Sequence, residues 1–264
     1  MDNQVVLTAF LLTLIAGLST GFGSLISLIA KRTNTVFLSF SLGLSAGVMI
    51  YVSFMEILPQ SLALFVGEFG DKAGTLYMIL GLFGGIALIA LIDFMVPKSS
   101  NPHEMKGVED MTSKKRLKHT GIITAITIAI HNFPEGIATF MSALNSMEIA
   151  IPITVAIAIP NIPEGIAVAV PIYHATGSRK KAFWLSFASG LAEPIGALIA
   201  YFFLLPYWSP ALDAFVLSAI SGIMIFISMD ELLPTAEKYG KHHHAIIGLV
   251  LGMLIMAFSL YLFV

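Results

Sequence analysis

Long apolar runs separated by short polar connections make up almost the whole chain of 264 residues. A helix that crosses a lipid bilayer needs about 20 mostly apolar residues in succession, and eight runs reach that length. They cover residues 5–30, 36–66, 74–96, 119–143, 149–173, 182–205, 211–236 and 243–263. This pattern predicts an all-α integral membrane protein in which eight transmembrane helices form a single domain over residues 1–264.

The charged residues lie mostly in the connections between the apolar runs. Asp, Glu, Lys and Arg make up 11% of the chain, against about 25% in an average soluble domain. If the runs cross the membrane alternately, thirteen of the 14 Lys and Arg residues fall in odd-numbered connections, and only Lys72 falls in an even-numbered one. Because cytoplasmic connections carry the excess of Lys and Arg, we expect the odd-numbered connections in the cytoplasm and both termini outside.

The stretch 97–118 is the one long connection and joins the third run to the fourth. Its sequence PKSSNPHEMKGVEDMTSKKRLK is rich in Pro, Ser, Lys and Glu, a composition typical of segments that do not pack. We therefore expect a mobile cytoplasmic loop that separates three spans from five.

Two related phrases predict an internal repeat. The second run contains SFMEILPQS (53–61) and the seventh contains ISMDELLPTA (227–236), each with an acidic residue, a short apolar stretch and a proline. These two runs cross the membrane in opposite directions, so we expect spans 1–3 and 6–8 to form an inverted repeat around a central pair, spans 4 and 5. Inverted repeats are typical of secondary transporters, which bind their cargo near the bilayer midplane.

The central pair carries the candidate chemistry. The fourth run contains IAIHNFPEGIAT (128–139), the fifth contains IAIPNIPEGIAV (157–168), and the sixth adds a glutamate in GLAEPIGA (190–197). Helical residues three or four positions apart share a face, so each phrase gathers its polar side chains on one side. Together the three helices predict a cage of nitrogen and oxygen ligands for a metal ion: His131, Asn132, Glu135, Asn161, Glu164 and Glu193.

Three of these ligands are carboxylates at a similar depth, and the three apolar runs contain no Lys or Arg. One carboxylate at the bilayer centre costs about 2.5–3.5 kcal/mol, and three of them repel one another. A divalent cation is the natural partner, and protons are the alternative for crowded carboxylates. We expect protons to occupy the carboxylates between metal ions.

The ligand types restrict the metal. The chain has no cysteine, which excludes disulfides, thiolate metal sites and cysteine nucleophiles. Carboxylates, amide oxygens and one imidazole suit Zn(II) first, with Fe(II), Mn(II), Co(II) and Cd(II) as further candidates, whereas the imidazole argues against a pure Mg or Ca site. We expect the metal to be the transported substrate, and we expect no cofactor.

With these motifs the chain resembles the ZIP (Zrt/Irt-like) family of divalent metal transporters, in its bacterial ZupT/GufA-type branch. The likeness rests on HNFPEG, NIPEG and GLAEPIGA in three successive spans, on the eight spans, and on the variable loop after the third. It implies a binuclear site bridged by Glu135 and Glu164. One metal position then uses His131, Glu135 and Glu164, and the other uses Asn132, Glu135, Asn161, Glu164 and Glu193.

Residue 160 departs from the family pattern. Related sequences usually place histidine or another polar ligand before the asparagine of the fifth span, whereas Pro160 has no ligating side chain. Water, or the carbonyl of Ala156 that this proline frees, would have to supplement the first metal position. Either that position is weakened, or the preference among metals shifts, or the substitution is not native.

Other polar residues are candidates for the transport path. By resemblance, Asp230 and Glu231 in the seventh span, with Asp93 in the third, form an exit-side station, while Glu56 in the second lies toward the entrance. A carboxylate near a helix end costs little, so an interfacial position without function is the alternative. The cluster of His242, His243 and His244 before the eighth span is either a transient metal collector or a solvated group.

These observations predict a transporter and not an enzyme. We expect zinc and other divalent cations to be imported across the bacterial inner (cytoplasmic) membrane by alternating access, with no ATP-binding motif and no nucleic-acid partner. The resemblance implies a homodimer surrounded by lipid, in which spans 1, 4, 5 and 6 move past spans 2, 3, 7 and 8. A passive metal channel is the alternative. An intramembrane zinc protease is disfavoured because the chain has no HExxH phrase.

Overall fold

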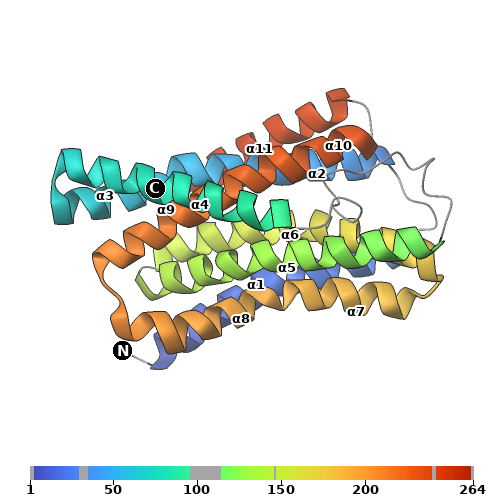
Figure 1. Cartoon of the computed structure of the whole chain (residues 1–264), viewed down its shortest axis with the longest axis horizontal. Helices are drawn as coiled ribbons and strands as arrows, with labels where there is room; N and C mark the ends of the chain where they lie inside the picture. The colour runs from blue at the N-terminus through green and yellow to red at the C-terminus, as the bar shows by residue number, and fades with distance from the viewer. Residues whose placement is uncertain (1–2, 30–34, 96–113, 146, 240–241, 263–264) are drawn as a thin grey trace.

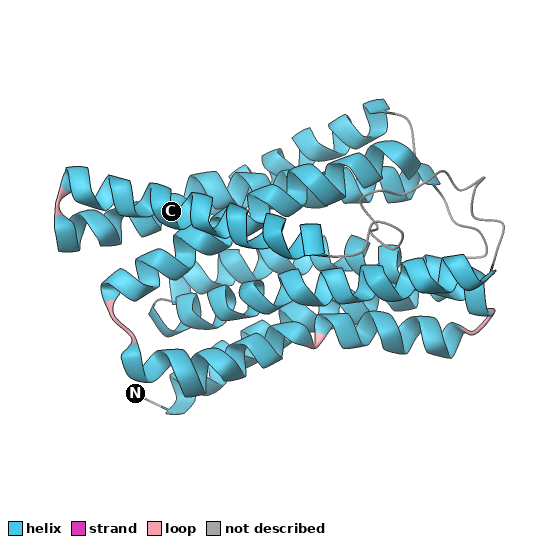
Figure 2. Ribbon diagram, viewed as in Figure 1, coloured by secondary structure: helices cyan, strands magenta, loops and turns pink. Residues whose placement is uncertain are grey.

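The computed structural model describes residues 3–29, 35–95, 114–145, 147–239 and 242–262, and this part contains helices and no strand (Figures 1 and 2). The helices are α1 (Asn3–Ile29), α2 (Thr35–Val52), η1 (Ser53–Ile57), α3 (Leu58–Phe69), α4 (Asp71–Met95), α5 (Lys114–Asn145), α6 (Met147–Thr176), α7 (Arg179–Gly190), α8 (Ala192–Ile199), η3 (Ala200–Leu204), η4 (Leu205–Tyr207), α9 (Pro210–Ile227), η5 (Ser228–Leu232), α10 (Leu233–Tyr239) and α11 (His242–Leu262). Helix therefore occupies all eight ranges in which a span is expected.

Seven stretches of the described chain are long and apolar enough to cross a membrane. They are Asn3–Leu25, Val36–Phe69, Asp71–Met95, Ile153–Val170, Arg179–Tyr207, Pro210–Glu237 and His242–Leu262. The helix α5 is not among these seven, although its 32 residues exceed the length of a span. The protein is thus an all-α, multi-pass membrane protein, as the apolar pattern predicts.

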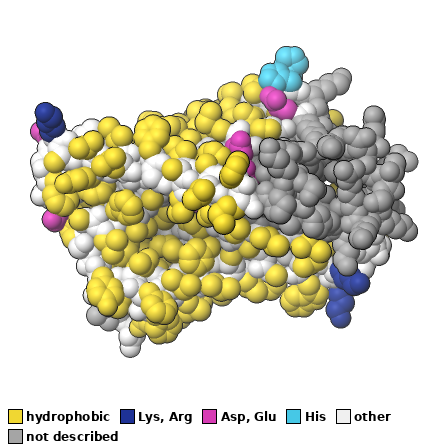
Figure 3. Space-filling view, viewed as in Figure 1, with side chains coloured by type: hydrophobic (Ala, Val, Ile, Leu, Met, Phe, Trp, Pro, Cys, Tyr) yellow, Lys and Arg dark blue, Asp and Glu magenta, His cyan; other side chains and the backbone are white. Residues whose placement is uncertain are grey.

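The visible surface has the character of a membrane protein. Among the described residues in Figure 3, hydrophobic side chains cover most of the visible face, and Lys and Arg are seen only near its two ends. Phe94, Leu262 and Phe203 are exposed to 80%, 78% and 68%, values that are unfavourable in water and suited to lipid. Both chain ends lie toward the same end of the molecule in Figure 1.

The expected loop 97–118 falls mostly outside the described residues. The structure resumes at Lys114, where α5 begins, so the last five residues of that expected loop are helical. Lys, Arg and Leu are good helix formers, and the sequence KKRLK therefore extends the helix.

The helices form two bundles that lie one above the other in Figure 1. The first consists of α1, α5, α6, α7 and α8, and the second of α2, α3, α4, α9, α10 and α11. The most extensive contacts between helices join α1 to α6, α5 to α6, α2 to α11 and α4 to α9. The bundles meet chiefly where α2 packs on α6.

Glycines let the helices within each bundle approach closely. A Cβ atom added to Gly23 would overlap the carbonyl of Ile162, and one added to Gly47 would overlap the carbonyl of Leu249. Among the described glycines, every such contact joins helices of the same bundle. Small residues are what allow membrane helices to pack backbone against backbone, so each bundle is tightly locked internally.

The contact between the bundles includes a cluster of apolar side chains. Leu38, Leu42 and Met49 of α2 belong to one buried cluster with Ala138 of α5 and Ile166 of α6. No glycine of one bundle that the structure describes packs on a backbone carbonyl of the other bundle, so the two bundles meet through side chains.

The inverted repeat is visible in equivalent glycine contacts. Gly252 of α11 packs on the carbonyl of Leu44 in α2, and Gly85 of α4 packs on the carbonyl of Ala219 in α9. Leu44 and Ala219 lie at matching positions of the repeated second and seventh spans. The pair α2–α11 is therefore equivalent to the pair α9–α4.

The repeated acidic phrases also share a backbone irregularity. A five-residue π-helical segment precedes Leu-Pro in both, as η1 before Leu58-Pro59 and as η5 before Leu233-Pro234. Proline cannot donate a backbone hydrogen bond to the carbonyl four residues earlier, and π-segments accommodate such a loss. The prolines of α5 and α6 do not end those helices.

Candidate metal centre

The six expected ligands lie inside the first bundle. His131, Asn132 and Glu135 come from α5, Asn161 and Glu164 from α6, and Glu193 from the first turn of α8. All six side chains are exposed by 2% or less. No Lys or Arg is among the buried residues that the structure describes, so no cationic side chain there neutralises the three carboxylates.

His131 joins the two central helices. Its Nε2 lies 3.0 Å from Oε2 of Glu164, which is hydrogen-bond distance. The other oxygen of Glu164 and Nδ1 of His131 have no hydrogen-bond partner. Each residue therefore keeps one buried polar atom without a hydrogen-bond partner.

Backbone carbonyls orient the two asparagines. Asn161 donates its Nδ2 to the carbonyl of Ala16 in α1 at 2.8 Å, and Asn132 donates its Nδ2 to the carbonyl of Ser189 in α7 at 3.4 Å. A carbonyl can only accept, so the NH₂ of each amide must face it. The amide oxygens consequently point away from these carbonyls, and both are buried without a partner.

Asn161 also holds Glu193. The amide nitrogen of Asn161 donates to Oε1 of Glu193, while Oε2 of Glu193 has no partner. The amide thus fixes one carboxylate oxygen and leaves the other available as a ligand.

Five buried polar atoms without partners, four of them oxygens, result from this arrangement. They are Nδ1 of His131, Oδ1 of Asn132, Oδ1 of Asn161, Oε1 of Glu164 and Oε2 of Glu193. A buried polar atom without a hydrogen bond is unfavourable by about 1–3 kcal/mol. Nitrogen and oxygen atoms of this kind, in this number and without any cationic side chain, have the chemistry of a site for a metal cation.

In this structure, the side chains that could bind a metal contact one another in pairs. Among the described residues, no three His, Asp or Glu side chains meet closely enough to hold one ion together. His131 pairs with Glu164, and Glu193 pairs with Asn161. A cation bound here must therefore open these pairs.

The two halves of the centre differ at residue 160. His131 on α5 corresponds to Pro160 on α6 within the repeated phrase, and Pro160 is buried. The imidazole of His131 reaches Glu164 on the opposite helix, whereas proline offers Glu135 no equivalent group. The centre is accordingly richer in side-chain ligands on the α5 side at this level.

The expected path residues lie outside this group. Glu231 of η5 is 7% exposed and lies within electrostatic range of His131. Asp230 is exposed, and Glu56 and Asp93 are half-buried. Of these four, Glu231 is the most buried.

The histidine cluster lies at the start of α11. Nδ1 of His242 is 2.7 Å from Oε1 of Glu237, and these side chains are 65% and 41% exposed. His243 is also exposed and its ring lies 5.8 Å from that of His242, while His244 is half-buried. This group is separate from the six buried residues.

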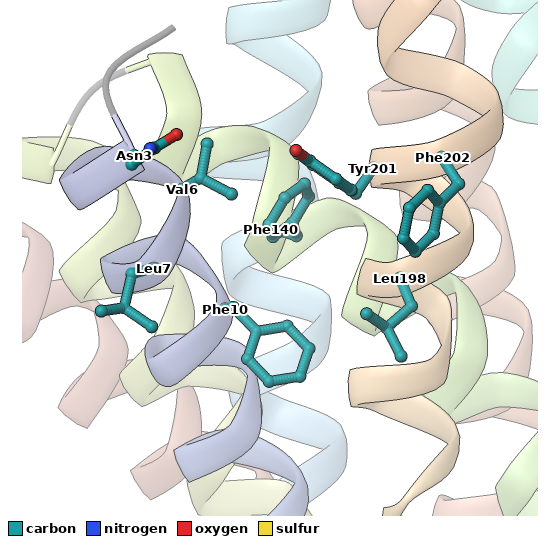
Figure 4. A pocket seen from close by; sticks show the side chains of 8 residues that line it. All are labelled: Asn3, Val6, Leu7, Phe10, Phe140, Leu198, Tyr201 and Phe202. Atoms are coloured by element: carbon teal, nitrogen blue, oxygen red, sulfur yellow. The ribbon is translucent and has the colours of Figure 1, made fainter.

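An apolar hollow of about 340 Å³ opens on the outside of the first bundle (Figure 4). None of the six expected ligands lines it. The lining residues are Asn3, Val6, Leu7, Phe10, Phe140, Leu198, Tyr201 and Phe202. It is therefore not the metal centre.

Sequence reasoning missed the carbonyls of Ala16 and Ser189, which orient the asparagines. Every residue has a carbonyl, so no side-chain motif marks these two. The sequence hints at their equivalence only through two similar phrases, AGLSTGFG (16–23) and SGLAEPIG (189–196), which share glycines at their second and last positions.

Helices in an inverted repeat, with a buried polar centre in one bundle, are an arrangement typical of membrane transporters. The sequence profile of the ZIP zinc transporter family matches residues 95–260. Curated relatives match over nearly the whole chain. A protein named "Zinc transporter ZupT" from Streptococcus mutans is 58% identical over 263 residues, with 99% of this chain and 100% of the relative covered.

Two further relatives carry the same name. The protein from Clostridium perfringens is 55% identical over 281 residues, covering 100% of this chain and 98% of the relative. The protein from Corynebacterium aurimucosum is 54% identical over 265 residues, covering 100% of both. The chain belongs to the ZIP transporter family, and it is a transporter and not an enzyme.

Proposed function

We propose that the protein imports divalent metal cations, chiefly Zn(II), through the centre formed by His131, Asn132, Glu135, Asn161, Glu164 and Glu193. The observation that carries this proposal is the set of five buried nitrogen and oxygen atoms without partners, in a bundle whose described buried residues include no Lys or Arg. The relatives named as zinc transporters support the same metal. Fe(II), Mn(II), Co(II) and Cd(II) are further cargo that oxygen and imidazole ligands accept.

The cation is transported substrate in this scheme, bound transiently by the chain's own side chains. Entry of the ion separates His131 from Glu164 and Asn161 from Glu193, and the freed atoms become ligands. Glu135 and Glu164 face each other from the two copies of the motif and carry most of the negative charge. Protons on the carboxylates replace the metal when the ion leaves.

Transport requires the centre to face each side of the membrane in turn. The tight glycine contacts stay within each bundle, and apolar side chains of α2 and α6 share one buried cluster. These features support an elevator-like movement of the first bundle, which carries the centre, against the second. A channel would need no such movement.

The orientation of the protein in the membrane is proposed from the charge distribution along the chain. Lys and Arg gather in the odd-numbered connections, which places these in the cytoplasm and both termini outside. The membrane is then the bacterial cytoplasmic membrane, with lipid on the apolar surface, and a homodimer is the assembly that the family suggests. Glu231, near His131, is the first station on the exit side.

The test is zinc uptake into proteoliposomes that contain the purified protein and a zinc-sensitive dye. Uptake should saturate with zinc, and Glu164→Gln should lower it about tenfold or more, as loss of a group that holds the metal does. Glu68→Gln makes the same chemical change on an exposed carboxylate of α3 and should leave uptake unchanged. Equal rates for all three proteins would contradict the proposal.

Cysteine cross-links separate a transporter from a channel. The chain has no cysteine of its own, so a pair introduced across the α2–α6 contact is the only one to react. An oxidised pair should stop zinc uptake, and reduction should restore it. Uptake that persists through the cross-link indicates a channel.

A further inference from the structure

The hydrogen bonds of the two asparagines are related by the internal repeat. Asn132 and Asn161 are equivalent positions of the repeated phrase on α5 and α6. Asn132 donates to the carbonyl of Ser189, and Asn161 donates to the carbonyl of Ala16. The contact of α5 with α7 is therefore equivalent to the contact of α6 with α1.

The glycines of the same phrases extend this equivalence. Gly136 packs on the carbonyl of Glu193, and Gly165 packs on the carbonyl of Thr20. Glu193 follows Ser189 by four residues, and Thr20 follows Ala16 by four. The contacts of α5 with α7 and α8 are thus repeated by the contacts of α6 with α1.

A second set of contacts gives the same alignment. Gly196 packs on the carbonyl of Phe133, and Gly23 packs on the carbonyl of Ile162. AGLSTGFG (16–23) therefore superimposes on SGLAEPIG (189–196), position by position. In this alignment the counterpart of the ligand Glu193 is Thr20.

The Thr20 hydroxyl cannot easily make the hydrogen bond that is usual for a helical threonine. Threonine in a helix generally donates to the carbonyl four residues earlier, as Thr13 does to Ala9 at 3.0 Å. For Thr20 that carbonyl belongs to Ala16, which already accepts from Asn161 and, at 2.6 Å, from Ser19. Thr20 is 0% exposed, and its Oγ1 has no hydrogen-bond partner.

The Thr20 side chain lies next to Gly190 of α7. The Cβ and Oγ1 of Thr20 lie beside Gly190, and the Cβ of Glu193 lies beside Gly17, which is the equivalent glycine. Both side chains flank the crossing of α1 and α7. Glu193 meets Asn161, and in the repeat the counterpart of Asn161 for Thr20 is Asn132.

From this equivalence we propose that Thr20 is a further ligand of the metal centre, which supplies a neutral hydroxyl oxygen from α1 where the repeat supplies the Glu193 carboxylate from α8. The proposal rests on the function proposed above. It gives the centre four contributing helices instead of three. The two sides then differ in a compensating way, with His131 and Thr20 on one and Pro160 and Glu193 on the other.

Thr20→Val tests this assignment because valine keeps the shape and removes the hydroxyl. In proteoliposomes the zinc concentration for half-maximal uptake should rise about tenfold, with little change in the maximal rate. Thr20→Ser should restore the wild-type value. Thr13→Val is the matched control on the same helix, equally buried with its hydroxyl already bonded, and should leave zinc dependence unchanged.

A binding measurement distinguishes the possible failures. Zinc should raise the thermal midpoint of the wild type in detergent, and Thr20→Val should need about tenfold more zinc for the same rise. If the wild type shows neither uptake nor this rise, the proposed function fails. If the wild type shows both and Thr20→Val matches it, or if serine fails to rescue a defect that Thr13→Val shares, the ligand assignment for Thr20 is overturned.

Discussion

Nε2 of His131 lies 3.0 Å from Oε2 of Glu164, and the two side chains are each 1% exposed. They come from equivalent phrases on α5 and α6, so this contact joins the two copies of the motif across the middle of the first bundle. An imidazole and a carboxylate are both metal ligands, and here each occupies the other's binding atom. Whatever cation enters the centre must compete with this contact.

Replacing His131 should change both rate and metal preference. His131→Ala removes the only imidazole among the six expected ligands and leaves oxygen alone, which favours Mn(II) relative to Zn(II). We expect zinc uptake to fall about tenfold or more, and manganese to compete more strongly than in the wild type. The measurement is zinc uptake with increasing manganese, and His242→Ala, an exposed histidine, is the control. An unchanged ratio of the two metals would exclude His131 as a ligand.

Replacing Asn161 by aspartate should destabilise the protein. Aspartate has nearly the same shape but cannot donate, so when it is ionised an acceptor would face the carbonyl of Ala16 and the carboxylate of Glu193. An unsatisfied buried contact of this kind costs about 2 kcal/mol. The thermal midpoint in detergent should fall, and zinc should recover part of the loss by compensating the added charge. A midpoint equal to the wild type would mean that the Asn161 donor is not needed.

Gly136 should tolerate no side chain. A Cβ there would overlap the carbonyl of Glu193, whereas a Cβ on Gly84 in α4 would meet nothing within 4 Å. Overpacking costs about 1–3 kcal/mol, and alanine in an open helical position gains about 0.5–1 kcal/mol over glycine. Gly136→Ala should therefore lower the thermal midpoint and Gly84→Ala should not. The opposite order would show that α5 and α8 are not packed as described.

Pro160→His should add a ligand to the side of the centre that lacks an imidazole. The substitution restores in the second phrase the residue that the first phrase has at position 131. We expect the number of zinc ions bound per chain to rise from one toward two, measured by metal analysis of the purified protein after dialysis. If the wild type already binds two, Pro160 does not weaken the first position.

Much of the centre could be predicted from the sequence because its side chains are chemically conspicuous. Carboxylates, an imidazole and amides are unfavourable inside apolar runs, so their presence there indicates a buried functional site. The helical ranges were predictable for a related reason, since hydrophobic length is a strong signal in membrane proteins.

The contacts that orient the ligands could not be predicted in this way. The carbonyls of Ala16 and Ser189 belong to the backbone, and their roles depend on which helices become neighbours. The equivalence of Thr20 and Glu193 is hidden for another reason, because a hydroxyl and a carboxylate look unrelated until the glycine contacts align α1 with α7 and α8. The π-segments before Leu-Pro likewise have no simple signature beyond the proline.

The most direct test of the account is anomalous scattering from crystals of the protein soaked in zinc, recorded on both sides of the zinc absorption edge. We expect a zinc peak between α5, α6 and α8, at about 2.0–2.2 Å from carboxylate oxygens of Glu135 or Glu164. His131 should then be separated from Glu164. Zinc bound only at the surface, for example at His242 and Glu237, with the His131–Glu164 pair intact, would contradict it.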